Sequence, residues 1–285
     1  MKYIFLLGLF ASLSSHGIVI RHDKVDSQYL TTIESFPPLA TFYIDGAHGT
    51  LIDSRWVVTA AHASFCIEPN RFVLIGNKPQ LIKNVFVNSN YTPGKSHDIA
   101  LVELAQPVLD VVPAQRYKMA DELGKDIWFI GIGGTGNGLT GQTIDNAKNR
   151  GVLRLAQNKI SSANGPLLEF VFDQGKTALP LEGVSGGGDS GGPAFLITDN
   201  GFKLFGVSSR FIGGSTGKYG ITEIYSRISY FNDWIDQIIH GTAEQRSLIS
   251  TNKLKHLPGG LTNDNLPMIC EQITLARDTV GIVNP

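Results

Sequence analysis

The sequence has little of several features that define common protein classes. Its 285 residues contain only two cysteines, too few for a zinc cluster or a disulfide-rich scaffold. Lys and Arg number 24 against 25 Asp and Glu, so no excess of positive charge is available to bind nucleic acid. Beyond the N-terminal segment, no apolar run is long enough to cross a membrane. We therefore expect a soluble mature protein that binds neither nucleic acid nor membrane.

Signals for a metal or a cofactor are also missing. The sequence has no His-x-x-x-His pair, no paired-cysteine motif and no calcium-loop spacing, so we expect no metal site. The segment 131–136 has the glycine spacing of a dinucleotide-binding motif. Loop-forming residues follow it where a helix should begin, so we expect no cofactor there.

The composition favours an all-β domain. Hydrophobic residues make up 42% of the chain, enough for a core, and 32 glycines with 13 prolines predict many tight turns. Segments 71–75, 84–87, 98–103 and 204–207 resemble strands. A helix is predicted over 230–240, where Gly241 follows apolar residues at helical spacing, namely Phe231, Trp234, Ile235, Ile238 and Ile239.

The N-terminal segment resembles a secretory signal peptide over residues 1–17. Lys2 precedes an apolar stretch over 3–13 that is too short to span a bilayer, and Ser15 and Gly17 suit a signal peptidase. Cleavage there leaves Ile18 as the mature N-terminus. We expect a secreted or periplasmic protein; the alternative is a buried N-terminal strand.

Three motifs could carry chemistry, and each also has a purely structural interpretation. His62 ends the segment Trp56-Val-Val-Thr-Ala-Ala-His62, where a histidine after a strand is often structural. Asp98 opens an apolar strand and needs a hydrogen-bond donor, or is an ordinary strand cap. Ser190 lies in the segment Gly186-Gly-Gly-Asp-Ser-Gly-Gly-Pro193. So many glycines let backbone N–H groups approach a ligand closely; the alternative is a simple glycine-rich turn.

Together, in this order, the three motifs resemble those of the chymotrypsin/trypsin family of serine peptidases, as a secreted member of bacterial type. The resemblance covers about residues 18–240. It implies two packed six-stranded antiparallel β-barrels, a first over about 18–115 and a second over about 120–230, then the helix. It also implies a peptidase domain over 18–241. The extension over 242–285 lies outside the resemblance, and the sequence does not indicate its role. A monomer acting on protein or peptide substrates is implied.

The resemblance also implies a mechanism. His62 would take the proton of the Ser190 nucleophile, Asp98 would hold the imidazole, and the N–H groups of Gly188 and Ser190 would form the oxyanion hole. An acyl-enzyme intermediate follows from these roles. The alternative is a catalytically silent relative that acts as a binding protein.

An activation pair is implied as well. In the family, a new N-terminal Ile or Val inserts beside the aspartate that precedes the nucleophile, here Asp189. Ile18 is the expected partner, and no Lys or Arg directly precedes it, since residues 14–17 are Ser-Ser-His-Gly. Signal peptidase itself would then generate the active enzyme; the alternative is a longer N-terminus with Asp189 satisfied otherwise.

For specificity, the resemblance places Val184 at the floor of the substrate pocket, and Arg210 and Gly220 at its walls. Valine offers no counter-charge, so we expect an uncharged residue before the cleaved bond. Arg210 could narrow the pocket, attract an acidic side chain or face solvent. Ser208 matches a serine that contacts the triad aspartate.

The family usually bridges two cysteines beside the catalytic histidine, and this chain has Ala47 and Ala63 there. Cys66 and Cys270 remain, and an exported compartment favours their oxidation. A Cys66–Cys270 disulfide would hold the extension across the first barrel; the alternatives are two free thiols or a tail that is trimmed away.

Overall fold

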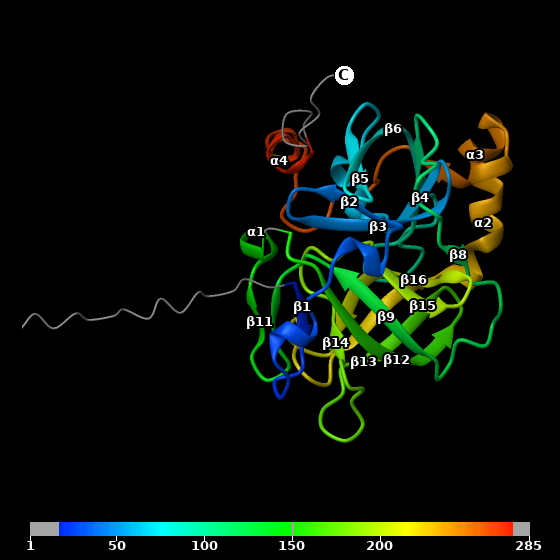
Figure 1. The fold of residues 1–285 in the computed structure, drawn as a ribbon. Coiled ribbons are helices and arrows are strands. Elements are labelled where there is room, and N and C mark those ends of the chain that lie inside the picture. The colour runs from blue at the N-terminus through cyan, green and yellow to red at the C-terminus, as the bar shows by residue number, and fades with distance from the viewer. Residues whose placement is uncertain (1–16, 150, 276–285) are drawn as a thin grey trace, which may run out of the picture.

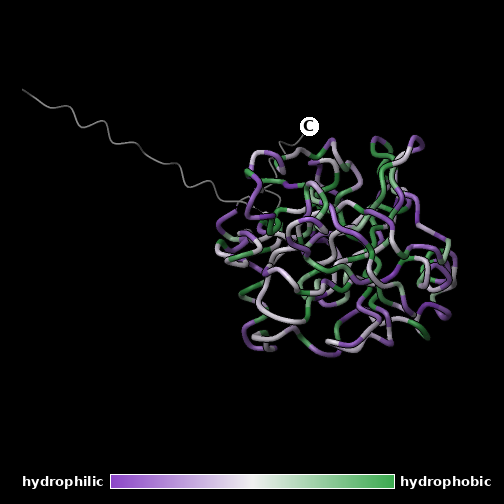
Figure 2. Tube along the Cα trace, turned by 90° about the horizontal axis from the view of Figure 1, so that it is seen from below, coloured by the Kyte–Doolittle hydropathy of each residue, from purple (hydrophilic) through white to green (hydrophobic). Residues whose placement is uncertain are grey.

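The computed structural model describes residues 17–149 and 151–275. Its strands form two closed barrels of six antiparallel strands each, together with a small third sheet (Figure 1). Many hydrophilic stretches lie along the outline of the molecule, as expected when the barrel interiors are apolar (Figure 2). The predicted all-β, trypsin-like architecture is confirmed. Residues 1–16 of the predicted signal peptide lie outside the described residues.

The first barrel is built from six strands in the order β6-β5-β2-β3-β4-β7, closed by pairing of β6 with β7. Strand β4 is buried on both faces between β3 and β7, which fits its apolar and β-branched residues. The bounds are β2 Leu39–Tyr43, β3 Gly46–Asp53, β4 Trp56–Thr59, β5 Phe72–Ile75, β6 Lys78–Asn88 and β7 Ala100–Leu104.

The second barrel has the order β15-β9-β12-β13-β17-β16, closed by pairing of β15 with β16. A short strand β8 adds to the edge of β16. The bounds are β8 Gln115–Arg116, β9 Asp126–Gly131, β12 Arg154–Asn164, β13 Leu167–Val171, β15 Pro193–Thr198, β16 Gly201–Ile212 and β17 Thr222–Arg227.

The third sheet has the order β11-β10-β1-β14 and changes one predicted boundary. Strand β1 was expected within the first barrel, yet it pairs with β10 and β14, and its Ile18 and Ile20 pack into the core of the second barrel. The first barrel therefore begins at Leu39. The bounds are β1 Ile18–Ile20, β10 Thr135–Asn137, β11 Gly141–Ile144 and β14 Gly183–Val184.

The predicted C-terminal helix is present as α2, Ile228–His240. It follows the last strand of the second barrel, but its buried Phe231, Ile235 and Ile238 join the core of the first barrel. The helix thus packs the two barrels together. The other helical segments are η1 Asp26–Gln28, η2 Ile33–Ser35, η3 His62–Cys66 and α1 Asn146–Asn149.

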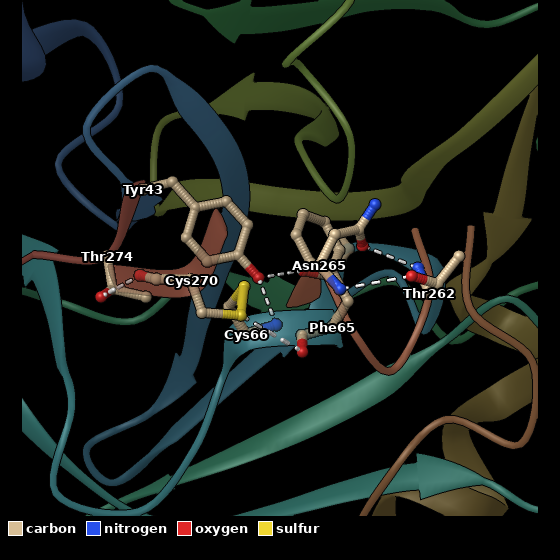
Figure 3. Close-up of a disulfide and its surroundings, with 8 residues drawn as sticks. Tyr43, Phe65, Cys66, Thr262, Asn265, Cys270 and Thr274 are labelled. Atoms are coloured by element: carbon tan, nitrogen blue, oxygen red, sulfur yellow. Dashed lines mark hydrogen bonds between the residues drawn. A yellow bond between two sulfur atoms is a disulfide. The ribbon is translucent and has the colours of Figure 1, made fainter. Parts of the chain in front are cut away.

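The extension after α2 runs across the first barrel as a C-terminal strap, residues 242–275. It contains α3 Ala243–Ile249, β18 Ser250–Thr251 and α4 Leu266–Ile273, and β18 extends the sheet beside β6. A disulfide joins Cys66 to Cys270, with the two Cα atoms 5.3 Å apart (Figure 3). The Ile44 amide also donates to the Ile273 carbonyl at 2.9 Å. The predicted disulfide is therefore confirmed.

Reduction of this disulfide should lower the stability of the fold. The bridge joins residues 204 apart, for which chain entropy alone gives about 5 kcal/mol, and typical losses are about 2–5 kcal/mol. We expect dithiothreitol to lower the urea midpoint of the wild type. The double variant Cys66→Ala/Cys270→Ala is the control, because its midpoint should be low with or without reductant. An unchanged wild-type midpoint would contradict the prediction.

Candidate active site

His62 and Asp98 come from neighbouring strands of the first barrel. His62 begins η3 shortly after β4, and Asp98 lies just before β7, whose Ala100 pairs with Thr59 of β4. Asp98 accepts from the His62 backbone amide at 2.8 Å, and its Oδ2 lies 2.7 Å from His62 Nδ1. Two bonds from one carboxylate fix both the backbone and the ring of the histidine.

Ser190 is delivered by the second barrel, in the loop between β14 and β15. Its Oγ lies 2.7 Å from His62 Nε2, which completes a continuous chain of hydrogen bonds from serine to aspartate. The loop docks on β3, where the Ala47 and His48 amides donate to the carbonyls of Gly188 and Ser190 at 2.7 Å each. The structure therefore brings His62, Asp98 and Ser190 together, as predicted.

Glycine is required at two places in this loop. Gly188 has φ of +96°, a conformation that costs other residues energy. A Cβ at Gly191 would lie 2.2 Å from the His48 carbonyl oxygen. Among the described residues, the N–H groups of Gly188 and Ser190 have no protein acceptor. These two donors are free to bind an oxyanion.

The surroundings of Asp98 and His62 favour their charged forms. Burial alone would raise the pKa of Asp98, but the His62 charge and hydrogen bonds from His62 and Ser209 hold it below its usual value. Burial alone would lower the pKa of His62, but the Asp98 charge and hydrogen bond raise it overall. Such a histidine is a stronger base than a free imidazole.

The prediction for Ser208 was wrong by one residue. Ser209 Oγ donates to Asp98 Oδ2 at 2.6 Å, whereas Ser208 pairs through its backbone with Gly191 and Gly192. A bulge in β16 between Ser208 and Arg210 adds one residue, and this turns Ser209 toward the aspartate. The only sign of Ser209 in the sequence was that it directly follows Ser208, so either serine could have been the one that contacts Asp98.

The three predicted pocket residues have different surroundings. Val184 packs in an apolar cluster with Val19, Phe172 and Ile221. Arg210 folds away toward the loop before Asp98, where its guanidinium donates to the Lys95 carbonyl at 2.8 Å. The third residue, Gly220, lies in a turn with φ of +84°.

Sequence reasoning missed one charged residue in this region. Glu223 is buried on β17, and the hydroxyl and amide of Ser185 lie within hydrogen-bonding reach of its carboxyl group. A charged residue between Ile221 and Ile224, in a segment rich in β-branched and aromatic residues, was the available signal.

Asp189 lies in a buried site that also holds Ile18. Its carboxylate accepts from the Gly133 amide at 2.6 Å and the Gly186 amide at 2.9 Å, and the Ile18 amide is a further hydrogen-bond partner. Burial raises the pKa of Asp189 to about 7. The structure thus brings together the predicted pair, Ile18 and Asp189.

His48 is a neighbour of Asp189 that stays neutral. Burial lowers the pKa of His48 to about 4. Its Nε2 accepts from the Ile132 amide at 3.2 Å, so Nδ1 carries the proton and faces Thr41 Oγ1 at the same distance. His48 Nε2 lies 3.7 Å from Asp189 but does not neutralise it.

Two further features bear on the kind of site. The described residues include no group of three or more His, Cys, Asp or Glu side chains that could hold a metal ion. Within the same part of the chain, no helix is long and apolar enough to cross a membrane.

Comparison with known proteins agrees with this geometry. The family model described as Trypsin matches residues 26–235. Transmembrane protease serine 11B of Homo sapiens is 28% identical over 240 residues, which cover 76% of this chain and 56% of that protein. Serine protease SSP1 of Scolopendra subspinipes is 28% identical over 226 residues, covering 70% of this chain and 76% of that protein. Transmembrane protease serine 11G of Mus musculus is 26% identical over 219 residues, which cover 70% of this chain and 52% of that protein.

This chain therefore spans only about half the length of the two transmembrane relatives. All three relatives are animal proteins, so they give no support to the expected bacterial type. The family model covers most of the chain. We conclude that this chain belongs to the trypsin family of serine proteases.

Proposed function

We propose that this chain is a secreted endopeptidase that cleaves protein or peptide substrates with Ser190 as the nucleophile. The observation that carries the proposal is the unbroken chain of hydrogen bonds from Ser190 Oγ through His62 to Asp98. A serine hydroxyl is a weak nucleophile at neutral pH and needs a base within hydrogen-bond reach. His62 Nε2 occupies that position.

The reaction follows from these contacts in two stages. Ser190 Oγ attacks the substrate carbonyl carbon while its proton moves to His62 Nε2. The protonated His62 then gives this proton to the leaving amine, which leaves an acyl group on Ser190. A water molecule then attacks the acyl carbon while His62 Nε2 takes its proton. Transfer of that proton to Ser190 Oγ releases the carboxylic acid product and restores the serine. Asp98 stabilises the imidazolium and keeps the proton of Nδ1 directed at its carboxylate.

The free N–H groups of Gly188 and Ser190 serve the charge that develops on the substrate oxygen. Two preorganised donors stabilise this oxyanion more than the neutral carbonyl, each by roughly 10²–10³ in rate. The positive φ of Gly188 supports this role because it sets the orientation of that part of the loop.

Processing between Gly17 and Ile18 would complete the site. The carboxylate of Asp189 lies buried beside the Ile18 nitrogen, so a free α-amino group there would form an ion pair with it. Ile18 also has φ of +61°, a conformation that costs a β-branched residue about 1–3 kcal/mol. Cutting the preceding bond removes that constraint. A signal peptide over 1–17 would combine export with activation.

Removal of the nucleophile tests the catalytic assignment. We expect Ser190→Ala to lower kcat on a fluorogenic peptide by roughly 10⁶-fold, with an unchanged melting temperature because little buried volume is lost. A fluorophosphonate probe should label the wild type at Ser190 and leave the variant unlabelled. Ser247→Ala, on an exposed face of α3, is the matched control and should keep full activity. Near wild-type turnover by Ser190→Ala would refute the assignment.

The start of the mature chain tests the activation pair. We expect N-terminal sequencing of exported protein to begin at Ile18. A chain that starts at Ile18 should exceed one that retains Gly17 by at least tenfold in kcat/KM, because only the former places a charged amine beside Asp189. In an Asp189→Asn background the two chains should be equally weak. Equal and full activity of both chains without that substitution would argue against the pair.

A further inference from the structure

A cavity lies between the C-terminal strap and the first barrel, away from the cleft of the triad. Its volume is about 1380 Å³, and it is lined by the strap, by β6 and by the segment that runs from η3 to Pro69. Sites for small molecules usually measure roughly 300–1,000 Å³, so there is room here for a segment of a peptide chain. The family match ends at residue 235, before the strap begins, and does not account for this cavity.

One side of the cavity is an unpaired edge of β6. In the closed barrel, β5 and β7 flank β6 on opposite edges, and β18 joins the edge opposite β7. On that edge, pairing with β5 ends at Leu81 and pairing with β18 begins at Val87. Residues 83–86 therefore have no partner strand there in the described part of the chain, and 84–86 line the cavity. An extended peptide can add to such an edge through backbone hydrogen bonds.

The charged side chains around the cavity are mostly cationic. Arg246, Lys253 and Lys255 line it, against a single acid, Glu68. None of these three cations forms an ion pair with an acid of the described segments. The net charge of the whole chain is −1, so this excess of positive charge is local. Unpaired cations beside a cavity attract acidic side chains and favour one orientation of the ligand.

Arg246 is held in place by its neighbours. Its guanidinium carbon lies 5.5 Å from the centre of the Trp56 ring and 5.4 Å from that of the Phe86 ring, and Nη2 donates to a backbone carbonyl of α2 at 3.0 Å. Glu103 interacts with it electrostatically but forms its ion pair with Lys83, at 2.7 Å. A guanidinium that is already oriented loses little freedom when it binds a carboxylate.

The rest of the lining suits a peptide better than a hydrocarbon chain. Phe65 and Leu254 line the cavity and also pack against the core of the first barrel. Asn252 and Asn263 line it with side-chain amides, and the described residues offer these amides no hydrogen-bond partner. A hydrocarbon chain would take the amides and the free edge of β6 out of water without replacing their hydrogen bonds, which is unfavourable. A peptide backbone can form those bonds while its apolar side chains contact Phe65 and Leu254.

The cavity begins close to the catalytic histidine. Ser64 lines it and is two residues from His62, so their Cα atoms are at most about 7.6 Å apart. A substrate whose cleaved bond lies at Ser190 can therefore reach the cavity with a segment a few residues further along its chain.

We propose that this cavity, the strap site, binds an extended acidic segment of a protein substrate at a distance from the cleaved bond. The segment adds to the free edge of β6, and its carboxylates contact Arg246, Lys253 and Lys255. The proposal rests on the proposed function, because it assigns the segment to a protein that is cleaved at Ser190.

Binding is measured in the inactive Ser190→Ala background, where no peptide is cleaved. The probe is a short fluorescein-labelled peptide in which Glu alternates with Val, and Gln replaces Glu in its partner. By fluorescence anisotropy, we expect the Glu peptide to bind at least tenfold more tightly. Lys253→Gln/Lys255→Gln should weaken it at least tenfold, and so should N-methylation of alternate peptide amides, which blocks strand pairing. The matched control, Lys118→Gln/Lys176→Gln, changes two exposed lysines away from the cavity and should bind like its parent.

Other occupants give different results. Equal binding of the two peptides, or no loss in Lys253→Gln/Lys255→Gln, would overturn the proposal. Oleate binding that depends on these lysines, without binding of the Glu peptide, would assign the strap site to a lipid instead. A dimer in sedimentation velocity that the same double variant abolishes, again without peptide binding, would assign it to a second copy of the chain.

Cleavage decides whether the segment belongs to a substrate. A fluorogenic substrate carries the Glu segment on a flexible linker, before the cleaved bond in one version and after it in another, and is compared with its Gln counterpart. For at least one version, we expect the Glu substrate to have at least fivefold higher kcat/KM in the wild type, mostly through KM. This ratio should fall to about one in Lys253→Gln/Lys255→Gln and stay at least fivefold in Lys118→Gln/Lys176→Gln.

Labelling of Ser190 by a fluorophosphonate separates the two proposals. If Ser190 is labelled but the wild-type ratio is one for both versions, the strap site is not a substrate site and the proposed function stands. If labelling fails while the Glu peptide still binds through Lys253 and Lys255, the proposed function is overturned, and with it the assignment of the segment to a substrate.

Discussion

Two backbone hydrogen bonds, from the amides of Ala47 and His48 to the carbonyls of Gly188 and Ser190, cross the boundary between the barrels at 2.7 Å each. His62 and Asp98 belong to one barrel and Ser190 to the other, so the 2.7 Å contact between His62 and Ser190 depends on this docking. The close approach also explains Gly191, because any side chain there would collide with the His48 carbonyl. The contact between β3 and the loop of Ser190 thus determines how the barrels pack, which conformation the loop adopts and how close Ser190 lies to His62.

Three buried carboxyl groups, those of Asp98, Asp189 and Glu223, belong to this region of the structure, and each has different neighbours that stabilise it. Asp98 is held ionised by His62 and by Ser209 from the second barrel. Asp189 receives backbone amides and lies beside the Ile18 nitrogen, a place suited to a newly formed amine. Among the described residues, Glu223 has only the hydroxyl and the amide of Ser185 as hydrogen-bond partners.

Sequence reasoning reached those features that depend on local pattern. The helix after Arg227 follows from the spacing of its apolar residues. The triad and the two-barrel class follow from three motifs that resemble those of a known family. Two cysteines allow one pairing only, although the sequence left free thiols or a trimmed tail as alternatives. Other features depend on register between distant strands. The bulge in β16 moved the contact with Asp98 from Ser208 to Ser209, and the pairing of β1 with β10 and β14 took Ile18–Ile20 out of the first barrel. Glu223 was missed because its burial depends on the pairing of β17 with β16, which a short segment of the sequence does not reveal.

The C-terminal strap replaces a support that the resemblance leads one to expect at the catalytic histidine. Family members usually bridge the positions held here by Ala47 and Ala63, and this chain has neither cysteine. Instead, the Tyr43 hydroxyl donates to the Ala63 carbonyl at 2.7 Å. The same hydroxyl accepts from the Cys66 amide at 3.0 Å (Figure 3). Cys66, the last residue of η3, is bonded to Cys270 of the strap. Because η3 begins with His62, the strap restrains the segment that carries the base, and the extension is thereby part of the support of the active site.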